Sequence, residues 1–448
     1  MGRRRAIAVR ASRRLLLLLL ALVALWGGGR LVQVAWESHY AGARGPYLQL
    51  LTSDGVSILW QTVRPSSAVV RFGPAAEGAR EELAVPEAAT RHRVRLEGLA
   101  PDTDYVYEVA GLGGGRFHTA PAAGARVPVR LWVQGDPGEP GPAAEAVVAA
   151  AFSWMRAHPR AGRPLLDLWL TTGDNAYRSG SNPQFQRALF EPRAGLLRKL
   201  PVWPAYGNHD ARRWAFFDIF ELPAAGEAGG LPSGTEHWFA LDYGPLHVVF
   251  LDTQLADLDA GGDMARWLEA DLAATDQPWR IAVFHHPPYT KGSHDSDRWR
   301  DSRGRMVRVR ENLVPLLEAG GVDLVLSGHS HMYERSHLLA CHYGASDTLR
   351  PEMIVDDGAD GEYRKAARPG APRGGTVYVV IGSSSKVDQG PLDHPAMAAA
   401  LARMGSLVID IDGPRLVLRF IDGDGAVADA FTLRKEGPPR PRTCRPAG

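Results

Sequence analysis

Five short clusters of residues between positions 135 and 331 hold side chains of the types that bind metal ions. They read GDPG at 135–138, GDNAY at 173–177, GNHD at 207–210, HHP at 285–287 and GHSH at 328–331. Carboxylates and imidazoles bind divalent or trivalent cations, and one carboxylate can bridge two ions roughly 3.5–4 Å apart. Such a pair lowers the pKa of a shared water and neutralises charge on phosphoryl oxygens. One cluster alone is a weak signal, but their number and order predict a two-metal centre that cleaves phosphate esters.

Apolar runs precede most of these clusters and predict the strands that must position them. The runs lie at 129–133, 166–170, 247–251, 281–284, 322–326 and 377–381, with helical patterns at 143–155, 264–273 and 306–317. Two further runs, 406–411 and 415–421, predict a terminal hairpin. Apolar strands joined by helices are typical of an α/β sandwich. Because the carboxyl ends of such strands meet at one edge, we expect the clusters to converge there.

Residues 45–122 predict a small β-domain that precedes the α/β part. Short strand-like runs at 47–51, 56–62, 68–72 and 91–96 alternate with turn residues at the spacing of a sandwich. The segment from Leu99 to Tyr107 resembles the corner of fibronectin type III domains, where a tyrosine at a strand start hydrogen-bonds back across the turn. Catalytic residue types do not cluster here, so we expect this domain to be structural or to frame the substrate.

The first 40 residues have the layout of an export segment. Six arginines, at positions 3, 4, 5, 10, 13 and 14, precede an apolar run, and residues 15–26 are all apolar. This order is typical of a signal peptide, and residues 12–17 resemble a twin-arginine signal. Because residues 15–35 approach the ~20 residues of a membrane span, an uncleaved anchor is the alternative. Both predict an exported protein that is periplasmic, extracellular or anchored facing outward.

Charge and cysteine content narrow the remaining possibilities. The formal net charge is +1, so nothing indicates a nucleic-acid partner. The two cysteines, Cys341 and Cys444, would form one disulfide in an exported chain or remain as two buried thiols. Residues 436–448 are rich in proline and arginine and are expected to form a disordered tail. The sequence gives no indication of the oligomeric state.

The order of the motifs resembles that of the purple acid phosphatases of the calcineurin-like metallophosphoesterase superfamily. Tyr177 closes a Gly-Asp-x-x-Tyr motif, and Glu334-Arg335 follows Gly-His-x-His-x-Tyr. The resemblance covers most of the chain, because those proteins also tend to carry a fibronectin-like N-terminal domain. It implies a β-sandwich at 45–122 followed by a four-layer αββα metallophosphoesterase sandwich at 127–435.

The resemblance also implies which residues bind each metal ion. Asp136, Tyr177 and His331 would hold the first ion, Asp174 would bridge, and Asn208, His285 and His329 would hold the second. The family's first ion is ferric iron, which suits a hard, anionic set of tyrosinate and carboxylates. An amide with two imidazoles suits a divalent ion such as zinc, manganese or ferrous iron. His285 rather than His286 is expected to bind, because His285-His286-Pro287-Pro288-Tyr289 fits the family's His-x-Pro-x-Tyr.

Three further residues are predicted to act on the substrate. His209 would stabilise the phosphoryl group or protonate the leaving oxygen, and Asp210 would orient its ring. His294 resembles a second histidine that faces the substrate, with an ordinary loop histidine as the alternative. A flap over the site is expected between residues 340 and 375. After the strand at 377–381, Gly382-Ser383-Ser384-Ser385 departs from the glycine pair of many relatives.

These expectations favour an exported phosphatase that hydrolyses phosphate monoesters by attack of a metal-bound hydroxide. A phosphodiesterase or nucleotide pyrophosphatase would use the same centre. A cell-surface binding module that retains the fold without activity is the alternative from another class. The predicted partners are a phosphate ester substrate and a membrane tether through the N-terminal apolar segment.

Overall fold

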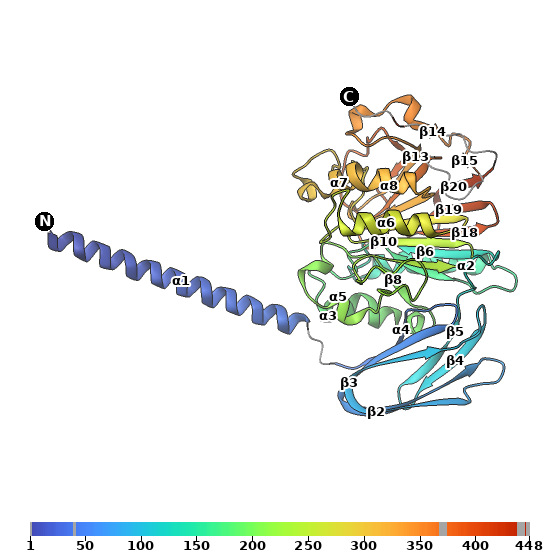
Figure 1. Ribbon diagram of the computed structural model, residues 1–448, viewed down its shortest axis with the longest axis horizontal. Helices are drawn as coiled ribbons and strands as arrows, with labels where there is room; N and C mark the ends of the chain where they lie inside the picture. Colours follow the sequence, from blue (N-terminus) through green and yellow to red (C-terminus); the bar gives the residue numbers. More distant parts are fainter. Residues whose placement is uncertain (1, 39–41, 367–373, 437–443, 445–448) are drawn as a thin grey trace.

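A computed structural model describes residues 2–38, 42–366, 374–436 and 444. Figure 1 shows a long N-terminal helix, a small β-region and a larger body of two sheets flanked by helices. The helix, α1 (Gly2–Ser38), projects away from the body, and its segment Leu19–Trp36 is long and apolar enough to cross a membrane. A signal sequence near the N-terminus would satisfy the same criterion, so α1 agrees with both alternatives for the export segment.

The N-terminal region is a five-stranded sheet that folds into two sandwich-like layers. One long strand, β2, joins the layers: its first half pairs with β1 and the end of β3, and its second half pairs with the start of β3 and with β4. The sequence predicted two strands here, at 56–62 and 68–72. That prediction was wrong, because β2 continues through an irregular register between Gln61 and Ser66. The strands are β1 (Arg44–Gln49), β2 (Gly55–Pro74), β3 (Glu81–Glu97), β4 (Asp104–Val109) and β5 (Gly113–His118).

The predicted corner is present at the start of β4. The backbone N–H of Ala100 donates to Tyr105 Oη at 2.9 Å. Both the tyrosine and its neighbour on the strand, Tyr107, are buried in the core of this region. The N-terminal region therefore has the tyrosine corner that the sequence indicated.

The first sheet of the body, which we call sheet I, carries the N-terminal motifs. Its order is β15-β20-β19-β18-β6-β7-β8, with β6, β7 and β8 parallel. Helix α2 (Pro142–Ala157) covers one face and packs Phe152 against Trp132 of β6. The predicted terminal hairpin is β18–β19, and β18 pairs with β6. The strands are β6 (Val129–Gln134), β7 (Leu168–Thr171), β8 (Val202–Pro204), β15 (Glu362–Lys365), β18 (Gly405–Asp412), β19 (Arg415–Asp422) and β20 (Val427–Lys435).

The second sheet of the body, sheet II, carries the histidine motifs. Its order is β14-β13-β16-β12-β11-β10-β9, with β17 paired to β13, and β10, β11, β12 and β16 are parallel. The strands are β9 (Phe239–Tyr243), β10 (Leu246–Leu251), β11 (Trp279–Phe284), β12 (Leu324–Ser327), β13 (Tyr333–Leu339), β14 (Ile354–Asp356), β16 (Thr376–Ile381) and β17 (Met397–Leu401).

Helices cover the outer face of sheet II. The principal ones are α6 (Asp263–Ala274) and a segment the sequence predicted as one helix, in which a π-turn separates α7 (Arg305–Arg308) from α8 (Val314–Ala319). Leu268 and Leu317 pack there with Phe284 and Val325 of the sheet. A second buried cluster joins the two sheets to each other, with Leu170 and Val283 among its members. The order helix, sheet, sheet, helix confirms the predicted αββα sandwich. Short helices in the loops are α3 (Asn182–Phe185), α4 (Glu191–Leu197) and α5 (Phe216–Ile219).

The N-terminal region packs on the body through hydrogen bonds near α3 and α5. The Arg44 guanidinium donates to Asn182 Oδ1 at 2.8 Å and to Gln186 Oε1 at 3.0 Å. Tyr47 Oη donates to the carbonyl oxygen of Ile219 at 2.9 Å. β1 therefore packs on the body beside the loop that follows Tyr177.

Candidate metal centre

The predicted ligands lie at the carboxyl ends of five strands, which belong to both sheets of the body. β6, β7 and β8 end at Gln134, Thr171 and Pro204, shortly before Asp136, Asp174 and Asn208. β11 ends at Phe284, directly before His285, and β12 ends at Ser327, two residues before His329. The structure therefore brings to one edge all seven side chains that the sequence singled out.

Four of these side chains meet at the hydroxyl of Tyr177. Tyr177 Oη lies 3.0 Å from Asp136 Oδ1, 3.1 Å from Asp174 Oδ2 and 3.3 Å from His331 Nε2. His331 Nε2 is in turn 3.4 Å from Asp136 Oδ1. Four donor atoms thus face a common point, as ligands of one ion do.

A second group of donors shares Asp174 with the first. Asn208 Oδ1 lies 2.9 Å from His285 Nε2 and 3.0 Å from His329 Nδ1. The other carboxylate oxygen of Asp174, Oδ1, is 3.5 Å from His285 Nε2. One oxygen of Asp174 therefore belongs to each group, which is the geometry of a bridging carboxylate.

The number of protons available to these side chains shows that the two groups of ligand atoms fit bound cations. Tyr177 Oη has one proton for three neighbouring acceptors. His285 Nδ1 lies 2.9 Å from the carbonyl oxygen of Thr172, so this nitrogen carries the proton and Nε2 presents a lone pair to Asn208 Oδ1. Burial and the neighbouring imidazoles hold the pKa of His329 well below its usual value, which favours the neutral form that binds metals. Acceptors that point at one another are stabilised by a positive ion between them.

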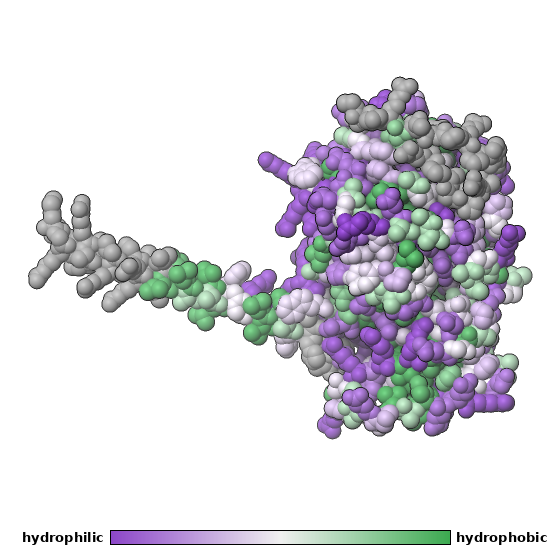
Figure 2. Space-filling model, in the orientation of Figure 1, coloured by the Kyte–Doolittle hydropathy of each residue, from purple (hydrophilic) through white to green (hydrophobic). Residues whose placement is uncertain are grey.

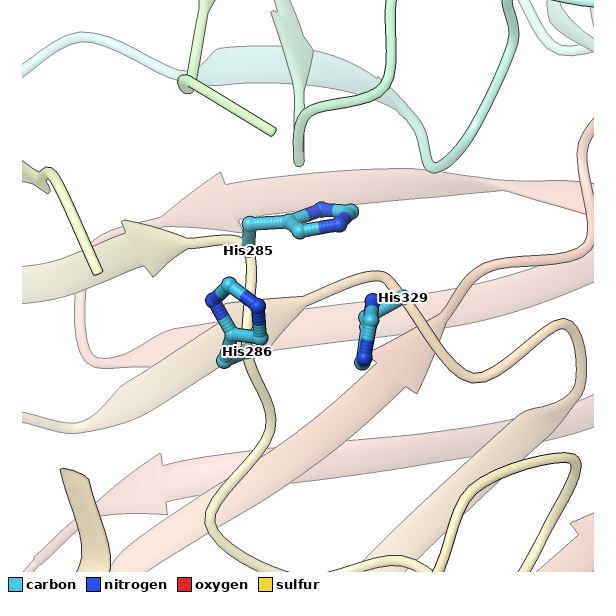
Figure 3. A group of neighbouring side chains, drawn as sticks. All are labelled: His285, His286 and His329. Atoms are coloured by element: carbon cyan, nitrogen blue, oxygen red, sulfur yellow. The ribbon is translucent and has the colours of Figure 1, made fainter. Parts of the chain in front are cut away.

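His286, the alternative to His285, lies beside the centre but faces another way. Figure 3 shows both rings on the segment that follows β11, with His329 opposite them. Nitrogen atoms of His285, His286 and His329 lie within 4.8 Å of one another, so ligation by this trio is geometrically feasible. However, His286 Nδ1 lies 2.9 Å from Thr253 Oγ1, whereas His285 Nε2 faces both Asn208 and Asp174. The geometry favours His285 as the ligand.

Glycines and left-handed backbone conformations make the close approach of these loops feasible. Asp136, Asp174 and His329 adopt φ of 53°, 53° and 67°, a region that residues with a Cβ rarely occupy. A Cβ at Gly207 would collide with Asp174, and one at Gly328 would collide with the carboxylate of Asp136. The glycines of these motifs therefore provide the space in which the ligands converge.

The two predicted substrate histidines flank the centre. The His209 ring lies 4.5 Å from the Tyr177 ring, and His209 Nε2 is 3.9 Å from Asp174 Oδ2. The His294 ring stacks on His329 at 3.9 Å, and its Nδ1 lies 2.8 Å from Asp301 Oδ1. Asp301 was not singled out by the sequence analysis, because seven positions of loop separate it from its partner.

The predicted role of Asp210 was wrong. His209 Nδ1 lies 2.7 Å from the carbonyl oxygen of Arg178, so this backbone oxygen, not Asp210, orients the ring. The Asp210 carboxylate is fully buried and accepts from the backbone N–H groups of Asn175 and Gly207 and from Asn175 Nδ2. Asp210 therefore holds together the two loops that carry Asp174 and Asn208, and it is a positioning residue.

The loop after β16 contributes residues that the sequence analysis missed. Asp388 Oδ2 lies 2.5 Å from His331 Nδ1, and Lys386 Nζ lies 3.6 Å from the centre of the Tyr177 ring. In the same loop, Ser384 Oγ accepts from the N–H of Gly135 and Ser385 Oγ donates to the carbonyl oxygen of Asp136. The serines that depart from the family pattern thus hydrogen-bond the loop that carries Asp136. In the sequence, the one feature that pointed to this loop was the serine run in place of the glycine pair.

The expected flap at 340–375 is not formed by the part of this segment that the structure describes. β14 pairs with β13 and β15 pairs with β20, so the segment extends the edges of the two sheets. Residues 367–373 lie outside the described part of the chain. The loop after β16, rather than this segment, lies beside the centre.

The chain resembles known phosphoesterases in sequence. The family model described as calcineurin-like phosphoesterase matches residues 129–333. Purple acid phosphatase 22 of Arabidopsis thaliana is 30% identical over 259 residues, which cover 54% of this chain and 53% of that protein. Human acid phosphatase type 7 is 28% identical over 326 residues, covering 62% and 67%. The chain thus spans about half to two thirds of the length of these relatives.

Solved structures show the same architecture. A purple acid phosphatase from yellow lupin seeds matches with a TM-score of 0.67 at 19% identity, over 87% of this chain and 74% of that one. PhoD matches with a TM-score of 0.59 at 14% identity, over 89% and 92%. At these identities the likeness concerns the fold alone. Residues 129–333 thus match the calcineurin-like phosphoesterase model, and the chain is similar in sequence and in fold to purple acid phosphatases.

Proposed function

We propose that this protein is an exported two-metal phosphatase that hydrolyses phosphate monoesters. The observation that carries the proposal is the pair of donor groups that share Asp174, one around Tyr177 Oη and one around Asn208 Oδ1. The first group is rich in anionic oxygen and suits ferric iron, whereas the second suits zinc, manganese or ferrous iron. When bound, the two ions would supply Lewis-acid charge and lower the pKa of a water nucleophile.

The chain's own side chains would hold the substrate over this centre. The carbonyl of Arg178 fixes His209 through Nδ1, and Asp301 fixes His294 in the same way. Two rings of fixed orientation on different sides of the centre can hold a phosphoryl oxygen and the leaving oxygen. We assign these two roles to His209 and His294.

Cationic side chains beside the centre favour a monoester over a diester. Arg212 lies 3.1 Å from His209 Nε2, and Lys386 lies over the ring of Tyr177. A phosphate monoester carries up to two negative charges near neutral pH, and a diester carries one, so additional positive charge stabilises the monoester more strongly. The same charges would also accept a polyphosphate, which keeps nucleotide pyrophosphatase as the second candidate.

The experiment compares three variants of the full chain with wild type on aryl and bis-aryl phosphates. We expect Asp174→Asn and His331→Ala to lose at least 100-fold in kcat on the aryl phosphate, because each removes a proposed ligand. Asp356→Asn, a carboxylate at the far edge of sheet II, is the matched control and should retain wild-type turnover. Undiminished turnover in both ligand variants would refute the proposal, and faster bis-aryl hydrolysis by wild type would favour the diesterase.

The metal content of the same preparations tests the proposed ions. We expect two transition-metal ions per chain and a broad visible absorption from the Tyr177 phenolate bound to ferric iron. Elemental analysis that finds no transition metal would instead favour the inactive binding module.

The N-terminal helix supports export with the body outside the membrane. Arginines cluster before the apolar segment Leu19–Trp36, and the body follows it. Such charge asymmetry keeps the arginine-rich end in the cytoplasm. We propose that α1 remains as an anchor, and the N-terminal mass of the membrane-extracted protein distinguishes this from cleavage.

A further inference from the structure

Two exposed loops next to the candidate metal centre share an unusual composition. Residues 212–214 read Arg-Arg-Trp and residues 298–300 read Arg-Trp-Arg. Trp214 is 61% exposed and Trp299 is 56% exposed. The exposed tryptophans of the described chain are these two and the pair in α1, Trp26 and Trp36. Together with Leu255, which is 58% exposed, we call these two loops the Arg/Trp rim.

All three parts of the rim border the centre. Arg212 contacts His209 and the carbonyl oxygen of Arg178. The loop around Trp299 runs from His294, which stacks on His329, to Ser302, whose Oγ lies 2.6 Å from His329 Nε2. Leu255 follows Thr253, which hydrogen-bonds the ring of His286. A surface that docks on the rim would therefore lie directly over the centre.

The tryptophan of the second loop has a defined position. A Cβ at Gly304 would lie 2.8 Å from the ring of Trp299, so the backbone passes directly beneath the ring. Gly304 adopts φ of 76°, which permits this approach. The indole is therefore supported from below while more than half of its surface stays exposed. The exposed face of this ring is therefore accessible from solvent in a fixed orientation.

The rim carries an excess of positive charge. Arg212, Arg213, Arg298 and Arg300 lie within its two loops, which contain no acidic residue. Of the nearby carboxylates, Asp295 pairs with Arg298, Asp297 pairs with Lys291, and Asp301 is engaged with His294. Tryptophan and arginine together are enriched where proteins meet the interface of a membrane, because the indole enters the headgroup layer and the guanidinium binds phosphate.

The anchor enters the body on the same side as the rim. α1 contacts α3, and Arg44, at the start of β1, hydrogen-bonds Asn182 of α3. Residues 39–43 connect α1 to β1 and can span at most roughly 20 Å. In Figure 1, α3, α5 and α7 lie on the side toward which α1 projects, and α5 and α7 follow the two rim loops closely in sequence. Figure 2 shows the apolar band of α1 leaving a mainly polar body on this side.

We propose that the Arg/Trp rim docks on an anionic lipid surface, so that the centre opens toward phosphate groups carried at the bilayer surface. The inference rests on the anchor assigned under the proposed function and deepens it by naming where the substrate is held. An aromatic substrate stacked between Trp214 and Trp299 is the competing occupant. The anchor favours the bilayer, because it keeps the rim within reach of headgroups at all times.

The test is backbone hydrogen exchange of the full chain in nanodiscs. One set contains phosphatidylcholine alone, and the other contains about 30 mol% phosphatidylglycerol, which gives the bilayer a negative surface potential that attracts basic segments. We expect amides of 210–216 and 296–304 to exchange at least fivefold more slowly in the anionic discs. The exposed strand segments around Leu83 and Val427 are the matched controls and should not change. Equal exchange of the rim in both discs would overturn the proposal.

A variant separates docking from catalysis. Arg298→Gln, Trp299→Ser and Arg300→Gln are combined, with Arg80→Gln and Leu83→Ser in the sandwich as the control variant. We expect the rim variant to lose the protection of both loops while it retains turnover of a soluble aryl phosphate. Loss of soluble aryl phosphate turnover in the rim variant, but not in the control variant, would identify the aromatic substrate as the occupant and overturn the proposal. Failure of wild type to turn over the aryl phosphate would refute the proposed function. The exchange experiment would still show whether the rim docks on the anionic bilayer.

Discussion

At the scale of single residues, Asp388 supports a side chain that the proposed chemistry needs. Its carboxylate lies 2.5 Å from Nδ1 of His331, whose Nε2 faces Asp136 and Tyr177. A carboxylate on the far nitrogen fixes the tautomer of a ligand histidine and raises its basicity. The sequence does not indicate this pairing, because 57 positions separate the two residues.

We predict that Asp388→Asn weakens metal binding without unfolding the protein. The amide cannot supply the negative charge that holds the imidazole in its binding form, and such changes lower metal affinity about 10–100-fold. The measurement is metal content after dialysis against graded chelator. Asp393→Asn, an exposed carboxylate of the same loop, is the control. Equal metal retention in both variants would show that Asp388 plays no part in binding.

At the scale of elements, a buried histidine joins α6 to sheet II. His247 of β10 lies 2.8 Å from Asp242 Oδ1 through Nδ1 and 2.8 Å from Asp271 Oδ2 through Nε2. Asp242 lies on β9 and Asp271 on α6, so one ring connects three elements. Burial alone lowers the pKa of an imidazole, but the two carboxylates outweigh it and raise the pKa of His247 to about 9.

This ion triad predicts a stability that depends on pH. The folded pKa is about 9 and the ordinary value is 6.5, so the charged ring stabilises the fold fully below pH 6.5 and loses that contribution as pH rises toward 9. The shift corresponds to a contribution of the order of 3 kcal/mol. Urea unfolding at pH 6 and pH 9 should show wild type losing more stability than His247→Gln, which has no charge to lose. Identical losses in the two proteins would contradict the assignment.

The strands and helices that position the candidate site could be predicted from the sequence, because buried parallel strands are apolar throughout. β11 and β12 carry this signal plainly, and both end beside a predicted ligand. The edge strands were not predictable in the same way. β14 and β17 are short and only half-buried, and their pairing with β13 depends on contacts made in the folded state.

The proposed metal ligands of the candidate site could also be predicted, because they follow these apolar strands. Most of the predicted metal-binding side chains follow strands within one to four residues, so their convergence can be inferred from residue types. Hydrogen bonds that orient those side chains use partners such as the carbonyl of Arg178, and a backbone carbonyl leaves no trace in a sequence. The wrong role of Asp210 follows from this limit.

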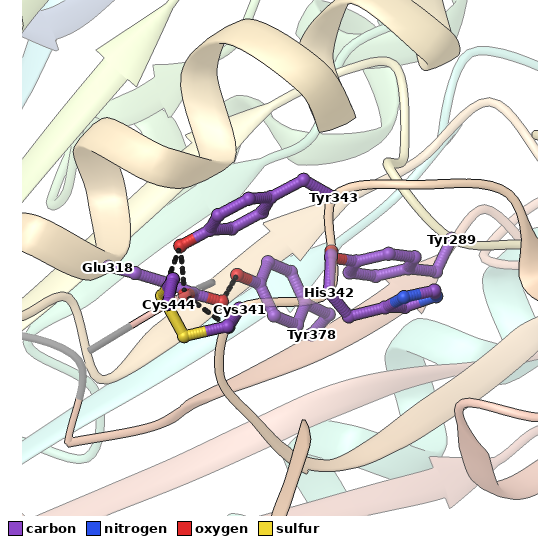
Figure 4. The surroundings of a disulfide bond; sticks show 7 residues. All are labelled: Tyr289, Glu318, Cys341, His342, Tyr343, Tyr378 and Cys444. Carbon is purple, nitrogen blue, oxygen red and sulfur yellow. Dashed lines mark hydrogen bonds between the residues drawn. A yellow bond between two sulfur atoms is a disulfide. The ribbon is translucent and has the colours of Figure 1, made fainter. Parts of the chain in front are cut away.

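At the scale of the whole molecule, the C-terminal end of the chain is joined covalently to the body. Cys341, in the loop after β13, forms a disulfide with Cys444, which settles the alternative of two free thiols. Figure 4 shows the bond beside Glu318, whose carboxylate accepts from Tyr343 Oη at 2.8 Å and from the N–H of Cys341 at 2.8 Å. The rest of the tail that was expected to be disordered, beyond residue 436, lies outside the described residues.

We predict that Cys444→Ser lowers the free energy of unfolding by about 2–4 kcal/mol, because the bond closes a long loop and restricts the unfolded chain. The two half-cystines are 103 positions apart. Urea unfolding with and without a phosphine reductant provides the measurement. The chain contains only these two cysteines, so reduced wild type should match the variant. A reductant effect of equal size in Cys444→Ser would assign the loss to another cause.

The left-handed conformations of Asp136, Asp174 and His329 lower the stability of the fold at the positions of three proposed ligands. Each costs of the order of 1–3 kcal/mol for a residue with a side chain, and glycine would occupy the same position freely. A glycine at any of the three positions would relieve this strain but would remove a proposed ligand. The large apolar interior of the two sheets supplies the stability that makes such strain tolerable.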